Sequence, residues 1–154
     1  MATAYLSLGS NLGNRRKYLI TAMALLAERA GDILCISTFY ETEPWGFESP
    51  NTFLNAAARL DTALKPLDLL AVTQQIEHNL GRTREPDDMR YQDRTIDIDL
   101  LLYDDILLDS SELTLPHPLM HQRLFVMLPL AEIAPRLRHP VLKCSMTELL
   151  GRLR

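Results

Sequence analysis

The sequence predicts an α+β fold, in which a mostly antiparallel sheet carries helices on one face. Three observations lead to this class. Residues 96–100 alternate apolar and acidic side chains, which is the two-residue period of a half-buried strand. Residues 15–30 and 65–80 instead repeat apolar side chains at helical spacing. Shorter apolar runs between these segments read as further strands, so the predicted order is strand, helix, strand, strand, helix, strand.

The first elements are set by apolar runs and turn residues. Residues 4–8 are predicted to form a buried strand, which runs into a turn rich in Gly, Ser and Asn. Asn14 is in position to cap a helix over residues 15–30, and Gly31 is expected to end it. The core stripe of this helix is Leu19, Met23, Leu26 and Ala30. Residues 33–40 follow as a second strand.

A third strand is predicted over residues 53–60, and a second helix over residues 65–80 with a proline in its first turn. The core stripe of this helix is Leu69, Val72, Ile76 and Leu80. Gln74, Glu77 and His78 fall off that stripe, so periodicity alone predicts a solvated face for them.

After the fourth strand, residues 106–108 are expected to return as a hairpin strand. A helix is predicted over residues 119–133, and a last helix over residues 146–153. This order is that of a ferredoxin-like α/β sandwich with an appended hairpin strand and extra C-terminal helices.

Composition limits the class of protein. With 154 residues, 47% of them apolar, residues 1–154 are expected to form a single domain. A net charge of −4 argues against a general nucleic-acid-binding protein. The two cysteines are far apart in the sequence, which argues against a disulfide framework or a zinc site. Neither a signal peptide nor a membrane span is recognisable, so we expect a soluble, cytoplasmic protein.

An acidic pair is the feature least like ordinary core sequence. On a strand, Asp97 and Asp99 share one face with their Cα atoms roughly 6–7 Å apart. Like charges this close repel, so a cation is expected over them. They are either a solvated face neutralised by Arg90 and Arg94 or a magnesium site. Three further apolar residues follow the alternating segment 96–100. They suggest a central strand, which favours the magnesium site.

The segment before this strand is rich in arginine. Arg82, Arg84, Arg90 and Arg94 lie within thirteen residues and lead directly into the acidic pair. Such a loop can serve solubility alone. Fixed cations beside metal-binding acids are, however, what phosphoryl transfer requires. Further along, His117 is held between two prolines near this site, whereas His78, His121 and His139 are expected at the surface.

Six short motifs occur in order along most of the chain. They are GSNLG at 9–13, FYET at 39–42, FLNA at 53–56, GRTR at 81–84, DRTIDIDL at 93–100 and PHPLMHQRLFV at 116–126. Together they resemble the 6-hydroxymethyl-7,8-dihydropterin pyrophosphokinases of folate biosynthesis, over about residues 4–135. The resemblance implies transfer of the β,γ-pyrophosphoryl group of ATP to a pterin hydroxymethyl oxygen, with release of AMP.

The resemblance also implies roles for individual residues. Asp97 and Asp99 would hold two Mg²⁺ ions that bridge the ATP phosphates and the acceptor hydroxyl, so that Asp97 also borders the substrate. Arg82 and Arg94 would contact the transferred phosphates or hold the site in place. The residues implied to hold ATP are Gln74, Glu77, Arg84, Arg90, Tyr91, Thr114, His117 and Arg123. The pterin would stack on Phe53 and Phe125, bond to the amide of Asn55, and be covered by Thr42, Pro44 and Trp45.

The chain departs from the family pattern in two places. Residues 91–94 read Tyr-Gln-Asp-Arg where many members have Trp-Gly-Pro-Arg, and Glu43 stands where some members have proline. The aromatic residue and the arginine are kept, so we expect an effect on loop closure rather than on the metal pair. The chain is expected to act as a monomer on small molecules, with no nucleic-acid or membrane partner.

Two other classes share part of the pattern. Nucleotidyltransferases also combine Gly-Ser with D-x-D, but their acids follow soon after the Gly-Ser helix, whereas here most of the domain intervenes. Ferredoxin-like regulatory modules share the order of elements, but they rarely need an arginine-rich loop before a D-x-D strand. The nucleotide product made from ATP and the pterin distinguishes these classes, because only the pyrophosphokinase releases AMP.

Overall fold

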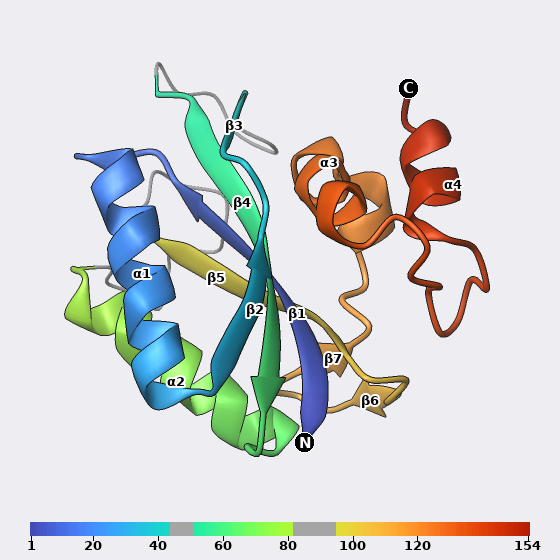
Figure 1. Ribbon diagram of the computed structural model, residues 1–154, viewed down its shortest axis with the longest axis horizontal. Coiled ribbons are helices and arrows are strands. Elements are labelled where there is room, and N and C mark those ends of the chain that lie inside the picture. Colours follow the sequence, from blue (N-terminus) through green and yellow to red (C-terminus); the bar gives the residue numbers. More distant parts are fainter. Residues whose placement is uncertain (44–50, 82–94) are drawn as a thin grey trace.

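The computed structural model describes residues 1–43, 51–81 and 95–154 (Figure 1). Its helices and strands are β1 (Ala2–Ser10), α1 (Arg15–Arg29), β2 (Asp32–Ile36), β3 (Tyr40–Thr42), β4 (Phe53–Thr62), α2 (Pro66–Asn79), β5 (Asp97–Tyr103), β6 (Leu108–Asp109), β7 (Thr114–Leu115), the 3₁₀ helix η1 (Met120–Gln122), α3 (Leu124–Ile133) and α4 (Met146–Gly151). Within these three ranges, no helix has the length and apolar character that crossing a bilayer requires.

The main sheet is antiparallel, with the strand order β2-β4-β1-β5 and β3 paired to the far end of β4. This order and the two helices between the strands confirm the predicted α+β class with a ferredoxin-like sheet. The prediction that the acidic strand is central is wrong, because β5 is the last strand of this order. Its apolar residues are buried because helices cover both of its faces, and not because strands flank it on both sides.

Helices cover the two faces of the sheet in pairs (Figure 1). α1 and α2 pack on one face over a core of apolar residues from β1, β4 and β5. On the opposite face α3 packs against β4 and α4 packs against α3, around a second cluster that includes Tyr5, Ala57 and Leu102. The C-terminal helices therefore occupy part of the face that we expected to be free, and they leave the end of the sheet near Asp97 for a site.

The alternation in β5 is interrupted by a bulge. Tyr5 pairs with Leu102 but Leu6 pairs with Leu100, so Leu101 is an extra residue on β5. Residues before the bulge keep the predicted pattern, with Ile98 and Leu100 in the core beneath α1 and α2. After the bulge the phase is reversed, which turns Leu102 towards α3 and α4.

Local signals set the first two helices as predicted. The Asn14 side chain accepts a hydrogen bond from the Lys17 amide at 3.1 Å, which caps α1. All four residues of its predicted core stripe are buried. In α2, Leu69 and Ile76 are buried and the other two members of the predicted stripe are partly buried against the core.

Three predicted elements differ from the structure. The second strand is divided into β2 and β3, because the Ser37 side chain replaces a main-chain group in the ladder and accepts from the Ala57 amide at 2.9 Å. β6 pairs with β7 and forms no hairpin with β5. The helix predicted over 119–133 is interrupted at Arg123, whose extended backbone (φ −112°, ψ 107°) separates η1 from α3.

Candidate active site

Three strands bring polar and small residues into rows on the face that carries α3. Asn55, Gly9 and Asp97 are successive cross-strand neighbours on β4, β1 and β5. The next row on the same face is Ala57, Ser7 and Asp99. In each row the residue on β1 is small, Gly9 or Ser7. These two residues form a shallow floor between the amide of Asn55 and the two carboxylates. The acidic pair therefore shares one face, as its spacing predicted.

The side chain of Asn55 is held in one orientation. The residue is only 2% exposed, and its Nδ2 donates to Thr42 Oγ1 at 2.5 Å. Its Oδ1 lies over Gly9, so closely that a Cβ on Gly9 would be 2.7 Å from it. Gly9 does not have a positive φ, so close approach alone requires glycine here. Thr42 and Asn55 were both predicted to contact the pterin, and the structure brings them together.

Two phenylalanines lie near this row. Phe53 pairs with Thr42 across β3 and β4, and its ring would be 3.4 Å from a Cβ on Gly9. Phe125 lies in the first turn of α3, which packs against β4. The guanidinium of the buried Arg123 is 5.7 Å from the centre of the Phe125 ring, a cation–π arrangement that orients both side chains.

Two predicted nucleotide-binding residues bond to the main chain of β5. The Glu77 carboxylate accepts a hydrogen bond from the Ile98 amide at 2.8 Å, and the His117 amide donates to the Leu101 carbonyl at 2.9 Å. An edge strand would otherwise leave such groups unpaired. Glu77 is 2% exposed, so the solvated face that periodicity predicted for it is wrong, because its carboxylate is used by β5.

The environment of His117 keeps its imidazole neutral. Burial and, to a smaller extent, the charge of Arg123 lower its pKa to about 4, and Asp97 partly opposes both effects. Its Nδ1 accepts from the Leu119 amide at 3.2 Å, which assigns the proton to Nε2. At neutral pH, His117 therefore offers one neutral N–H donor close to Arg123 and Asp97.

The other predicted residues are placed as follows. Gln74 is exposed on α2, one turn before Glu77, and Thr114 is half-buried on β7. His78 is exposed, as predicted. Outside the described residues lie Pro44, Trp45, Arg82, Arg84, Arg90, Tyr91 and Arg94, so their roles stay predictions.

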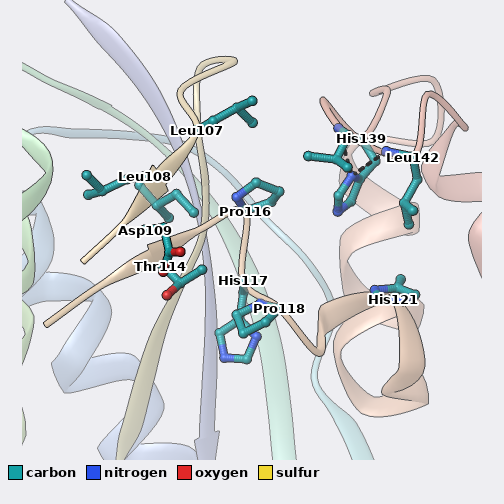
Figure 2. A pocket seen from close by; sticks show the side chains of 12 residues that line it. Leu107, Leu108, Asp109, Thr114, Pro116, His117, Pro118, His121, His139 and Leu142 are labelled. Carbon is teal, nitrogen blue, oxygen red and sulfur yellow. Dashed lines mark hydrogen bonds between the residues drawn. The ribbon is translucent and has the colours of Figure 1, made fainter. Parts of the chain in front are cut away.

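A cavity of about 430 Å³ lies between the β6–β7 hairpin, the Pro-His-Pro segment and residues 139–142 (Figure 2). His121 and His139 line it, with ring centres 6.2 Å apart. His139 is buried, and its Nδ1 accepts from the amides of Val141 and Leu142, so the prediction of a surface residue is wrong. His121 is also partly buried rather than exposed. Of the predicted site residues that the structure describes, this cavity is lined by Thr114 and His117.

The acidic pair fits a magnesium ion better than a metal held by protein alone. Asp97 and Asp99 are half-buried, and their neighbours on β1 are uncharged and small. In the part of the chain that the structure describes, no three His, Cys, Asp or Glu side chains gather closely enough to hold a metal. Mg²⁺ commonly takes one or two carboxylates and completes its shell with water and substrate phosphates. Two carboxylates on an accessible face suit that mode.

Sequence reasoning missed three contributors to this region. Gly9 was treated as part of a weak turn motif, although its close approach to Asn55 shapes the floor. Tyr40 and Glu132 are hydrogen-bonded to each other at 2.6 Å beside the Asn55 row. The available signal for Glu132 was its spacing of seven residues from Phe125, which puts both on one side of a helix.

Known proteins resemble this chain in sequence and in fold. Residues 5–135 match the family described as 7,8-dihydro-6-hydroxymethylpterin-pyrophosphokinase (HPPK). A protein of Porphyromonas gingivalis named 2-amino-4-hydroxy-6-hydroxymethyldihydropteridine pyrophosphokinase is 55% identical, over 91% of this chain and 95% of its own. The Bacillus subtilis protein of the same name is 48% identical, over 84% of this chain and 77% of its own.

Solved structures agree in fold. A crystal structure of an HPPK-DHPS protein in complex with substrates superimposes with a TM-score of 0.78 at 17% identity, over 98% of this chain. The chain spans 43% of that longer protein, so the likeness concerns the fold of one part of it. The match over residues 5–135 and the two close relatives establish that this chain belongs to the HPPK family.

Proposed function

We propose that residues 1–154 form a single pyrophosphokinase domain of folate biosynthesis. It transfers the β,γ-pyrophosphoryl group of ATP to the hydroxymethyl oxygen of 6-hydroxymethyl-7,8-dihydropterin and releases AMP. Membership in the HPPK family supports the reaction class. The observation that carries the proposal is the cross-strand row in which an oriented amide, a glycine floor and a carboxylate follow one another across β4, β1 and β5.

The row matches the shape of the acceptor. Asn55 and Asp97 are separated by two strand spacings, about 9–10 Å. A flat bicyclic ring that bonds to Asn55 at one end and lies over Gly9 directs its hydroxymethyl arm towards Asp97. Because Nδ2 of Asn55 already donates to Thr42, the amide is ordered before the pterin arrives.

Aromatic side chains supply the stacking faces. The Phe53 ring lies beside Gly9. Phe125 projects from α3, and the guanidinium of Arg123 helps to orient its ring. Apolar faces with a few oriented polar groups are typical of sites for flat heterocycles. Pro44 and Trp45 are proposed to cover the ring.

Asp97 and Asp99 are proposed to hold two Mg²⁺ ions. When bound, these ions would supply positive charge that helps to bind the ATP phosphates and offsets the charge that develops during in-line displacement. Both carboxylates lie on the face that borders the pterin. Ions and phosphates held there would therefore be close to the acceptor hydroxyl.

The nucleotide is proposed to lie along the outer edge of β5. Glu77 and His117 are anchored to the main chain there, and Gln74, Thr114 and Arg123 flank them. His117 donates Nε2–H to a nucleotide oxygen without adding a charge, whereas Arg123 supplies a fixed positive charge. Arg82, Arg84, Arg90, Tyr91 and Arg94 are proposed to complete the phosphate and nucleotide contacts.

The identity of the nucleotide product tests the proposal. Purified protein is incubated with ATP, Mg²⁺ and 6-hydroxymethyl-7,8-dihydropterin, and nucleotides are separated by ion-exchange chromatography. The proposal predicts AMP in equal amount to the pterin diphosphate, and no AMP without the pterin. Formation of ADP, or release of free pyrophosphate without a pterin product, would contradict it.

A further inference from the structure

Glu132 of α3 receives hydrogen bonds from three donors in Thr38 and Tyr40, around the start of β3. Its carboxylate accepts from the Thr38 hydroxyl at 2.7 Å, from the Thr38 amide at 3.0 Å and from the Tyr40 hydroxyl at 2.6 Å. Thr38 lies in the short connection between β2 and β3, and Tyr40 is the first residue of β3. The carboxylate thus ties the C-terminal half of α3 to the start of β3.

Both ends of this tether border the proposed pterin site. Tyr40 is the cross-strand partner of Asn55, and Thr42, two residues further on the same face, accepts the Asn55 hydrogen bond. On α3, Glu132 and Phe125 are seven residues apart, about two turns, and therefore lie on the same side of the helix. One end of this side is fixed by Glu132 while the other carries Phe125.

We propose that Glu132 is a positioning residue for the pterin: its tether to Thr38 and Tyr40 fixes the gap between Phe125 on α3 and the Asn55–Thr42 wall on the sheet. This inference rests on the proposed function, because it assigns a task to those walls. The tether joins α3 to Thr38 and Tyr40, not to the acidic pair or the β5 edge, so its main effect is expected on the pterin and not on the nucleotide.

The chemistry of the tether suits this task. Hydrogen bonds from Tyr40 and then from Thr38 lower the pKa of Glu132, and the same bond raises the pKa of Tyr40. At neutral pH the acceptor is ionised and the donor keeps its proton, so the charge-assisted bonds are fully formed. Glu132 is exposed, so water replaces these bonds when they are removed, and global stability depends on them little.

Kinetics on four variants test the inference. Tyr40→Phe and Glu132→Gln weaken the tether with little change in shape, Thr38→Val removes one hydroxyl donor, and Thr38→Ser keeps it. We expect the KM for the pterin to rise about threefold to fivefold in Tyr40→Phe and Glu132→Gln, the size expected for a charge-assisted bond that water can replace. The KM for ATP and kcat should stay within about twofold. Thr38→Val should raise the pterin KM, whereas Thr38→Ser should keep the wild-type pterin KM.

Glu148→Gln is the matched control. The Glu148 carboxylate also accepts from a main-chain amide, that of Ser145, but it belongs to the cap of α4, away from β3 and β4. It should leave both KM values unchanged. Because Tyr40 and Glu132 share one interaction, the double variant should not exceed the larger single effect.

The outcomes separate this inference from the proposed function. Unchanged pterin KM in Tyr40→Phe and Glu132→Gln, with a raised pterin KM in Asn55→Ala, would overturn the inference alone. Equal rises in the KM for pterin and ATP would also overturn it, because a general loosening of the fold would then explain the effect. Wild-type protein that makes no AMP would overturn the proposed function instead.

Discussion

Replacing Gly9 with alanine tests how the floor of the site orients Asn55. The added Cβ would lie 2.7 Å from Asn55 Oδ1 and 3.4 Å from Phe53 Cδ1. Ordinary contacts begin at 3.4 Å, so the amide oxygen must move by about 0.7 Å. That movement displaces the Nδ2 atom that donates to Thr42 at 2.5 Å. Overpacking of this kind costs about 1–3 kcal/mol, so pterin affinity should fall about tenfold or more.

Calorimetry provides the assay for Gly9→Ala. The pterin is titrated into protein that is saturated with a non-hydrolysable ATP analogue, and the analogue is titrated separately. We expect loss of pterin affinity and unchanged affinity for the analogue. Gly151→Ala is the control, because a Cβ at Gly151 meets nothing within 4 Å. Pterin affinity within twofold of wild type in Gly9→Ala would refute the role given to this floor.

Three further predictions concern the acids, the helix-borne aromatic and the histidine. Asp97→Ala and Asp99→Ala should each abolish turnover while the circular dichroism spectrum and thermal unfolding stay native; retained turnover in either would remove that carboxylate from the mechanism. Phe125→Ala should weaken pterin binding more than ATP binding, and equal losses in calorimetry would contradict its stacking role. The His117 imidazole should titrate near pH 4 in NMR spectra, since burial, together with the charge of Arg123, lowers its pKa from 6.5 to about 4. Because the unfolded chain then binds the extra proton, the free energy of unfolding should fall by up to about 3 kcal/mol as the pH drops from 6.5 to 4, and a midpoint near 6.5 would contradict this environment.

Local patterns in the sequence were enough for the main elements. The alternation of residues 96–100 and the stripes of the first two helices have a period, and the side chains that create it face the same core in the structure. Asn14 and Gly31 mark the ends of α1 by short-range rules. The order of elements then leaves few topologies, and the observed sheet is the ferredoxin-like one.

Long-range pairing explains what the sequence did not predict. The edge position of β5 depends on which strand its backbone meets, and its three apolar residues are equally consistent with burial by helices. The Leu101 bulge and the Ser37 interruption arise from register with β1 and β4, which no local pattern encodes. Helical periodicity likewise predicted an exposed Glu77, whereas in the structure its carboxylate is buried and bonds to the Ile98 amide.

The candidate site shows the same division. Asp97 and Asp99 could be paired from their spacing, because a strand imposes the shared face. The contacts of Asn55 with Gly9 and of Glu132 with Tyr40 depend on the register of the sheet and on the position of α3 against it. Neither can be read from the sequence. Family resemblance named Asn55 and Phe125 without giving the interactions that hold them in place.

A crystal structure of the protein with Mg²⁺, a non-hydrolysable ATP analogue and the pterin is the most direct test of the central claim. The account predicts magnesium density between the carboxylates of Asp97 and Asp99 and the analogue's phosphates, with the hydroxymethyl oxygen of the pterin in line with the β-phosphorus. An acidic pair bonded only to protein cations, with no ion bound and the analogue elsewhere, would contradict it.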